Sequence, residues 1–147
     1  MIDRFIRYIQ TEKRYSAHTL RAYGKDLEQF SDYINKKYEL DNILLVDNQI
    51  IRSYIIDLKE EGLENRSINR KISTLRSFYC YCIREKYIKV TPLAGIKSLK
   101  QPKELAKFVP EHDIDKLSFD CDDDFVARRD EIVFEILYQT GMRQSEL

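Results

Sequence analysis

Arginines and short hydroxyl side chains recur along one part of the sequence at the spacing of a single helix face. Residues 65–86 have the apolar periodicity of a long amphipathic helix. Guanidinium groups neutralise phosphates and small hydroxyls fix register against them, so such a face suits contact with a nucleic-acid backbone. An ordinary solvated helix face is the alternative. Opposite the apolar stripe, and without a carboxylate among them, lie Arg66, Arg70, Ser73, Thr74 and Ser77.

The overall composition sets limits on the class of protein. The 147 residues include 25 basic and 25 acidic side chains. This balance excludes a nucleic-acid-binding protein with a uniformly basic surface, and it excludes an acidic disordered tail. With 43% hydrophobic residues, four glycines and three prolines, the sequence is typical of a soluble, helix-rich globular protein. The charge is divided, because residues 1–107 hold 21 basic and 14 acidic residues whereas residues 108–147 hold 4 and 11. We therefore expect two units with different partners.

The cysteines and the lack of long apolar runs bear on the protein's location. Cys80, Cys82 and Cys121 are odd in number, so reduced thiols are expected rather than a disulfide framework. The N-terminus lacks an apolar signal-peptide core, and no apolar run approaches the roughly 20 residues that a membrane helix needs. We expect a cytoplasmic protein that does not contact membranes.

Metal and cofactor sites have little support. His18 and His112 are far apart, and the glycines are too isolated to form a phosphate-binding loop. The acidic run Asp120–Asp124 with Glu131 has the spacing of a calcium loop, but Phe125 stands where the sharp turn requires glycine. A solvated acidic loop is the favoured interpretation, and we expect neither a metal nor a cofactor.

Apolar periodicity divides the chain into helices and shows no strand pattern, so an all-α protein is predicted. Helices are expected at about residues 2–9, 17–34, 49–61, 65–86, 110–117 and 126–140, with another beginning near residue 144. Side chains that can cap a helix and glycines that can end one mark these boundaries. The expected N-caps are Ser16, Asp47 or Asn48, and Asn65, and the expected stops are Gly62 and Gly141.

Distinctive stretches follow one another along almost the whole chain. In the first hundred residues they are Phe5-Ile-Arg-Tyr, Ser16-Ala-His-Thr-Leu, Tyr23, Asp26-Leu, Asn69-Arg-Lys-Ile-Ser-Thr-Leu-Arg and Thr91-Pro-Leu-Ala-Gly-Ile. Later ones are Arg129-Asp and Thr140-Gly-Met-Arg-Gln-Ser-Glu-Leu. In this order they resemble the core-binding domain and the start of the catalytic domain of tyrosine recombinases, most closely Xer-type recombinases and related phage or mobile-element integrases.

The resemblance implies a domain order and partners. It implies a SAM-like bundle of four to five helices at residues 1–98, a linker at 99–108 and the first part of a catalytic domain at 109–147. The first domain would grip duplex DNA, and the linker lysines Lys100, Lys103 and Lys107 would follow its backbone. In such enzymes a tyrosine attacks the scissile phosphate to form a 3′-phosphotyrosyl link without a metal or other cofactor. Protomers assemble as tetramers on two DNA sites.

The resemblance also implies roles for particular residues. Arg21 and Lys25 would join the DNA contact, because the family inserts both helices around the major groove. Arg143 matches a catalytic arginine, and a guanidinium suits this role because it can donate two parallel hydrogen bonds to phosphate oxygens. Glu146 is expected to position the turn that carries Arg143. The nucleophilic tyrosine is expected beyond Leu147, so the chain would be incomplete and inactive alone.

Two alternatives remain open at this point. The chain could be a stand-alone helical DNA-binding module without catalysis. It could also be a protein–protein adaptor whose basic face binds acidic partners.

Overall fold

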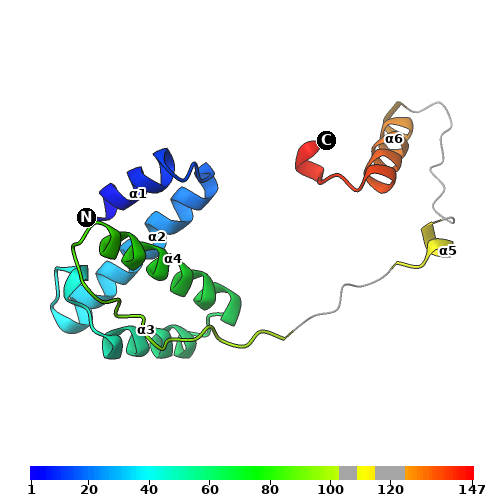
Figure 1. Cartoon of the computed structure of the whole chain (residues 1–147). Helices are drawn as coiled ribbons and strands as arrows, with labels where there is room; N and C mark the ends of the chain where they lie inside the picture. The colour runs from blue at the N-terminus through cyan, green and yellow to red at the C-terminus, as the bar shows by residue number, and fades with distance from the viewer. Residues whose placement is uncertain (103–108, 115–124) are drawn as a thin grey trace. The chain divides into compact units, whose positions relative to one another are not determined.

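The computed structural model describes residues 1–102, 109–114 and 125–147, and every regular element within these ranges is helical. The all-α prediction is confirmed for this part of the chain. The chain forms two compact units, Met1–Pro102 and Lys103–Leu147 (Figure 1). In order, the elements are α1 (Ile2–Thr11), α2 (Ala17–Tyr38), η1 (Ile43–Leu45), α3 (Asn48–Glu60), α4 (Asn65–Arg84), α5 (Glu111–Ile114), α6 (Phe125–Thr140) and η2 (Gln144–Glu146).

The first unit is a four-helix bundle built around α4. α2 packs against α1, α3 and α4, and α3 also packs against α4. Phe5 of α1 meets Phe78 of α4 edge to face, with ring centroids 5.5 Å apart. Phe30 and Ile51 bring α2 and α3 into the same core, and all four side chains are at most 1% exposed. Burying each such side chain contributes about 1.5–3 kcal/mol, which holds the helices around α4.

Most of the predicted helix boundaries are confirmed. The Ser16 hydroxyl accepts a hydrogen bond from the backbone N–H of Thr19 at 3.3 Å, and Asp47 rather than Asn48 caps α3. Gly62 and Gly141 follow α3 and α6 with φ of +82° and +64°, a backbone region that glycine adopts at low cost.

The start of α4 differs from the prediction. Glu64 is the N-cap residue, without a capping side-chain hydrogen bond, and Asn65 is already inside the helix. The Asn65 amide instead donates to the carbonyl oxygen of Lys100 at 2.8 Å. The sequence pattern predicts Asn65 as the cap of α4, but its side chain binds the backbone of Lys100 instead.

Residues 91–100, here called the strap, run back along α3 and α4 after the bundle is complete (Figure 1). Asn69 of α4 pairs with the backbone of Leu99 in both directions, donating to its carbonyl at 2.9 Å and accepting from its N–H at 2.8 Å. Asn48 donates to the carbonyls of Pro92 and Ala94, both at 2.9 Å. The chain therefore leaves the first unit from a fixed position beside the N-terminal half of α4.

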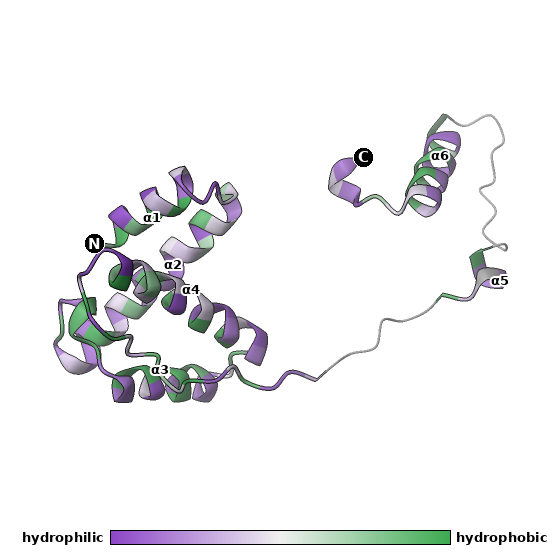
Figure 2. Cartoon of the chain, in the orientation of Figure 1, coloured by the Kyte–Doolittle hydropathy of each residue, from purple (hydrophilic) through white to green (hydrophobic). Residues whose placement is uncertain are grey.

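The second unit contains two described α-helices, and hydrophobic positions along α6 are visible in Figure 2. Within the described residues, no side chain of α6 is buried, and Phe125 is 79% exposed. α5 matches the first part of the helix predicted at 110–117, and the rest of that prediction falls on residues that lie outside the described ranges. The acidic run Asp120–Asp124 and the calcium alternative lie there too, as do Lys103 and Lys107. No helix within the described ranges is long and apolar enough to span a bilayer.

Candidate nucleic-acid interface

Five side chains spaced three or four residues apart form the exposed side of α4, here called the outer strip. This spacing places them on one face of the helix. Arg66, Arg70, Ser73 and Cys80 are exposed and Ser77 is half-buried. The strip contains two cations, two hydroxyls and no carboxylate, so it keeps the chemistry that the sequence predicted for this face. It consists of Arg66, Arg70, Ser73, Ser77 and Cys80.

Thr74 does not lie on this face, although the sequence pattern placed it there. It is fully buried, and its hydroxyl donates to Oδ2 of Asp26 at 3.0 Å. A helical wheel with a single apolar stripe implies that the helix packs against one neighbouring element along that stripe. α4 instead packs against α2, α3 and Phe5 of α1, so its buried arc is wider and also takes in Tyr81 and Lys71.

The carboxylate of Asp26 is the centre of the seam between α2 and α4. Asp26 is 3% exposed and accepts hydrogen bonds from the Arg70 guanidinium, from Lys71 Nζ at 3.3 Å and from the Thr74 hydroxyl. Lys71, itself buried, also donates to the side-chain oxygen of Gln29. Because two cations and a hydroxyl surround it, the buried charge of Asp26 is compensated rather than stranded.

Sequence reasoning missed the Asp26 cluster, although one signal for it was present. Asp26 lies at the edge of the apolar arc that Leu27 and Phe30 define on α2, where a carboxylate must find partners when it is buried. The pattern did not show which cations would reach it. Arg70 belongs both to this cluster and to the surface. One guanidinium nitrogen donates to Asp26, while the side chain is 48% exposed.

The basic side chains of α2 lie near its two ends, Arg21 and Lys25 in the first half and Lys36 and Lys37 in the last turn. Arg21 and Lys25 are both exposed, and Lys25 directly precedes Asp26 in the α2–α4 seam. The turn before α2 adds two exposed cations, Lys13 and Arg14, which the sequence analysis did not select. Arg21 and Lys25 therefore give the first half of α2 an exposed basic surface, and neither residue is among those that contact Asp26.

The outer strip is followed on α4 by a guanidinium with different surroundings. Arg84 lies 3.9 Å from the ring centroid of Tyr8 and pairs with Glu12 and Glu85. These carboxylates offset the charge of Arg84. Between Arg66 and Cys80 α4 itself has no carboxylate, and Arg70 pairs with Asp26 of α2.

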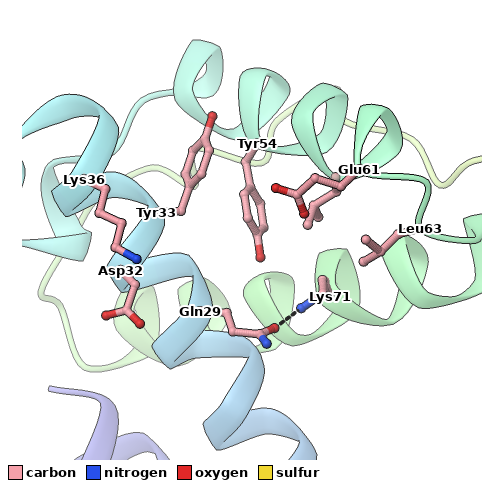
Figure 3. Close-up of a pocket in the computed structure, with 9 residues that line it drawn as sticks. Gln29, Asp32, Tyr33, Lys36, Tyr54, Glu61, Leu63 and Lys71 are labelled. Carbon is pink, nitrogen blue, oxygen red and sulfur yellow. Dashed lines mark hydrogen bonds between the residues drawn. The ribbon is translucent and has the colours of Figure 1, made fainter.

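A hollow of about 400 Å³ lies between α2, α3 and α4, and Lys71 is one of the residues that line it (Figure 3). The Tyr54 ring points into it, and its hydroxyl is the one buried side-chain polar atom without a partner among the described residues. Burial raises the pKa of Tyr54 well above its usual value. Lys36, Asp32 and Glu61 line the hollow together with Lys71, whose ammonium is already paired with Asp26.

Arg143 lies in the second unit, in the turn between α6 and η2. Its side chain is 82% exposed, and Nη1 donates to Oε1 of Glu146 at 3.0 Å. Oε2 of Glu146 accepts from the backbone N–H of Arg143 at 2.8 Å. The prediction that Glu146 positions this turn is confirmed, because one carboxylate holds both the backbone and the guanidinium of Arg143.

Comparison with known proteins agrees with this geometry. The profile of the phage integrase N-terminal SAM-like domain matches residues 2–86, a segment that contains all four helices of the bundle. The chain therefore belongs to the phage integrase family and carries the N-terminal SAM-like domain of a Xer-like tyrosine recombinase.

Individual relatives match along the whole chain. It is 38% identical over 147 residues to tyrosine recombinase XerC of Oceanobacillus iheyensis, covering 99% of this chain and 48% of that protein. It is 36% identical over 148 residues to tyrosine recombinase XerD of Staphylococcus aureus, covering 100% of this chain and 50% of that protein. The chain thus spans about half the length of these relatives. No solved structure matches it significantly.

Proposed function

We propose that the first unit binds duplex DNA through the outer strip of α4 and the basic first half of α2. The observation that carries this proposal is the strip itself, an exposed and carboxylate-free helix face with arginines and hydroxyls at consecutive turns. Arg66 and Arg70 would neutralise phosphates, while Ser73 and Ser77 would fix the register of the helix. Thr74 has no place in this contact because it is buried.

We propose further that the chain is the DNA-binding portion of a site-specific recombinase that cuts and rejoins DNA through a 3′-phosphotyrosyl intermediate. The division at 1–98, 99–108 and 109–147 would then correspond to the core-binding domain, the linker and the start of the catalytic domain. Protomers would assemble as a tetramer on two DNA sites. These statements rest on the likeness to XerC and XerD proteins, of which the chain spans about half.

Arg143 would act on the scissile phosphate in this reaction. Its exposed guanidinium can donate hydrogen bonds to two non-bridging oxygens as negative charge gathers on them. Glu146 uses one guanidinium nitrogen and leaves other donors available. The attacking tyrosine would come from the half of the relatives that this chain does not span, so residues 1–147 should form no covalent adduct with a nicked suicide substrate. A covalent adduct would contradict this assignment.

The DNA-binding proposal can be tested with a fluorescein-labelled 30-base-pair duplex and fluorescence anisotropy at 100 mM salt. Replacing both strip arginines (Arg66→Gln with Arg70→Gln) should weaken binding by more than about tenfold, because the double variant removes two cations that neutralise phosphates. The matched control is Arg52→Gln, which removes an exposed arginine of α3 from outside the strip. Equal losses in the two variants, or no binding by the wild type, would contradict the proposal.

A further inference from the structure

The three donors that hold Asp26 come from one turn of α4. Arg70, Lys71 and Thr74 approach the carboxylate from within a five-residue segment. Lys71 and Thr74 are buried, so they fix the carboxylate from the protein interior. Arg70 approaches from the surface, where almost half of its side chain remains exposed.

We infer that Asp26 is a positioning residue for DNA binding, which holds the Arg70 guanidinium in the orientation that meets a phosphate. This inference rests on the proposed function of the outer strip. Arg70 has five N–H donors, and Asp26 engages only Nη1. The remaining donors are presented from a guanidinium whose position is already set. An arginine oriented in advance loses less conformational entropy when it binds, so Arg70 contributes more affinity than a freely rotating arginine at the same position.

Arg66 provides the contrast on the same strip. Within the described ranges, its side chain has no hydrogen bond or ion pair, and it is exposed one turn before Arg70. It therefore acts as a mobile cation whose contribution comes from counterion release alone. Arg66 should not depend on Asp26, whereas Arg70 should.

A double-mutant cycle separates these two arginines. The variants Asp26→Asn, Arg70→Gln and their combination are titrated with the same labelled duplex at 100 mM salt. In the wild-type background, Arg70→Gln should weaken binding about tenfold. In the Asp26→Asn background it should weaken binding by about threefold or less, because the orientation that Asp26 supplied is already lost. Arg66→Gln should weaken binding by the same factor in both backgrounds.

The chain offers a matched control carboxylate. Asp57 of α3 ties α3 to α2 by accepting from Lys37 and from the Tyr33 hydroxyl, but it contacts no arginine of the strip. Asp57→Asn should leave the tenfold effect of Arg70→Gln unchanged. A role confined to fold stability would make both carboxylate variants unfold at lower temperature, and it would leave the effect of Arg70→Gln on binding equal in every background.

Asp26→Asn is checked first by circular dichroism and thermal unfolding. If Asp26→Asn does not fold, the same double-mutant cycle is measured with Asp26→Glu. This substitution keeps the charge but moves the carboxylate by one methylene. An equal effect of Arg70→Gln with and without the change at Asp26 overturns this inference while the DNA-binding proposal stands. Failure of the wild type to bind the duplex, even at 50 mM salt, overturns both.

Discussion

Two of the arginines that we assign to phosphate contact, Arg70 and Arg143, are held in different ways. Arg70 is half-exposed and bound to a carboxylate 44 residues away on another helix, and that carboxylate is buried. Arg143 is 82% exposed and bound to Glu146 only three residues away. The first position depends on the assembled bundle, whereas the second depends on one local turn. Substitutions at Asp26 should therefore destabilise the whole first unit, whereas substitutions at Glu146 should affect only the turn around Arg143.

The largest effect is expected when the buried carboxylate is removed. Asp26→Ala leaves the ammonium of Lys71 buried without its charged partner, which costs about 3 kcal/mol of unfolding free energy or more. Urea unfolding followed by circular dichroism measures the loss. Asp57→Ala removes a more exposed carboxylate and should cost much less. Adding Lys71→Met to Asp26→Ala should recover part of the loss, because it removes the stranded charge.

Equal destabilisation by Asp26→Ala and Asp57→Ala would contradict the view that the α2–α4 seam is a buried charge cluster. So would a further loss, rather than a recovery, in the variant that also carries Lys71→Met.

An intermediate effect is expected at the strap. Asn69→Ala leaves the N–H and the carbonyl of Leu99 without their side-chain partners, at a cost of about 1–2 kcal/mol. Amide hydrogen exchange should rise at Leu99 and nearby in residues 91–100, while the exchange of α1 amides stays unchanged. Exchange that rises evenly across the bundle would show that the strap is part of the core and not a separately attached segment.

The smallest effect on global stability is expected at the local turn. Glu146→Ala removes the acceptor of the Arg143 N–H, and loss of such a cap costs about 1 kcal/mol in the turn. Hydrogen exchange of the Arg143 amide should accelerate, while the unfolding transition of the first unit stays the same. A lower unfolding temperature of the bundle would contradict the local character of this site.

The same contrast explains which features the sequence could predict. Ser16, Asp47 and Gly62 act on groups within four residues of themselves, so spacing alone reveals their roles. Glu146 also acts locally, and its role follows from the family resemblance of the turn that carries it. The all-helical fold follows in the same way from apolar periodicity.

Residues whose roles depend on distant partners were not predictable by spacing. Asn65 and Asn69 bind the strap 35 and 30 residues away, and Asp26 of α2 binds side chains of α4. Thr74 was placed on the wrong face because a helical wheel cannot show that three helices surround α4. A helix contacted from several sides buries polar residues beside its apolar stripe, and they are then satisfied by partners from other elements.

The most direct test of the central claim is the salt dependence of duplex binding by the 147-residue chain. If the outer strip and the first half of α2 contact about six phosphates, the logarithm of the association constant should fall against the logarithm of salt concentration with a slope of about −5 between 50 and 200 mM. A slope near zero, or no binding at 50 mM salt, would contradict the claim that this surface binds DNA.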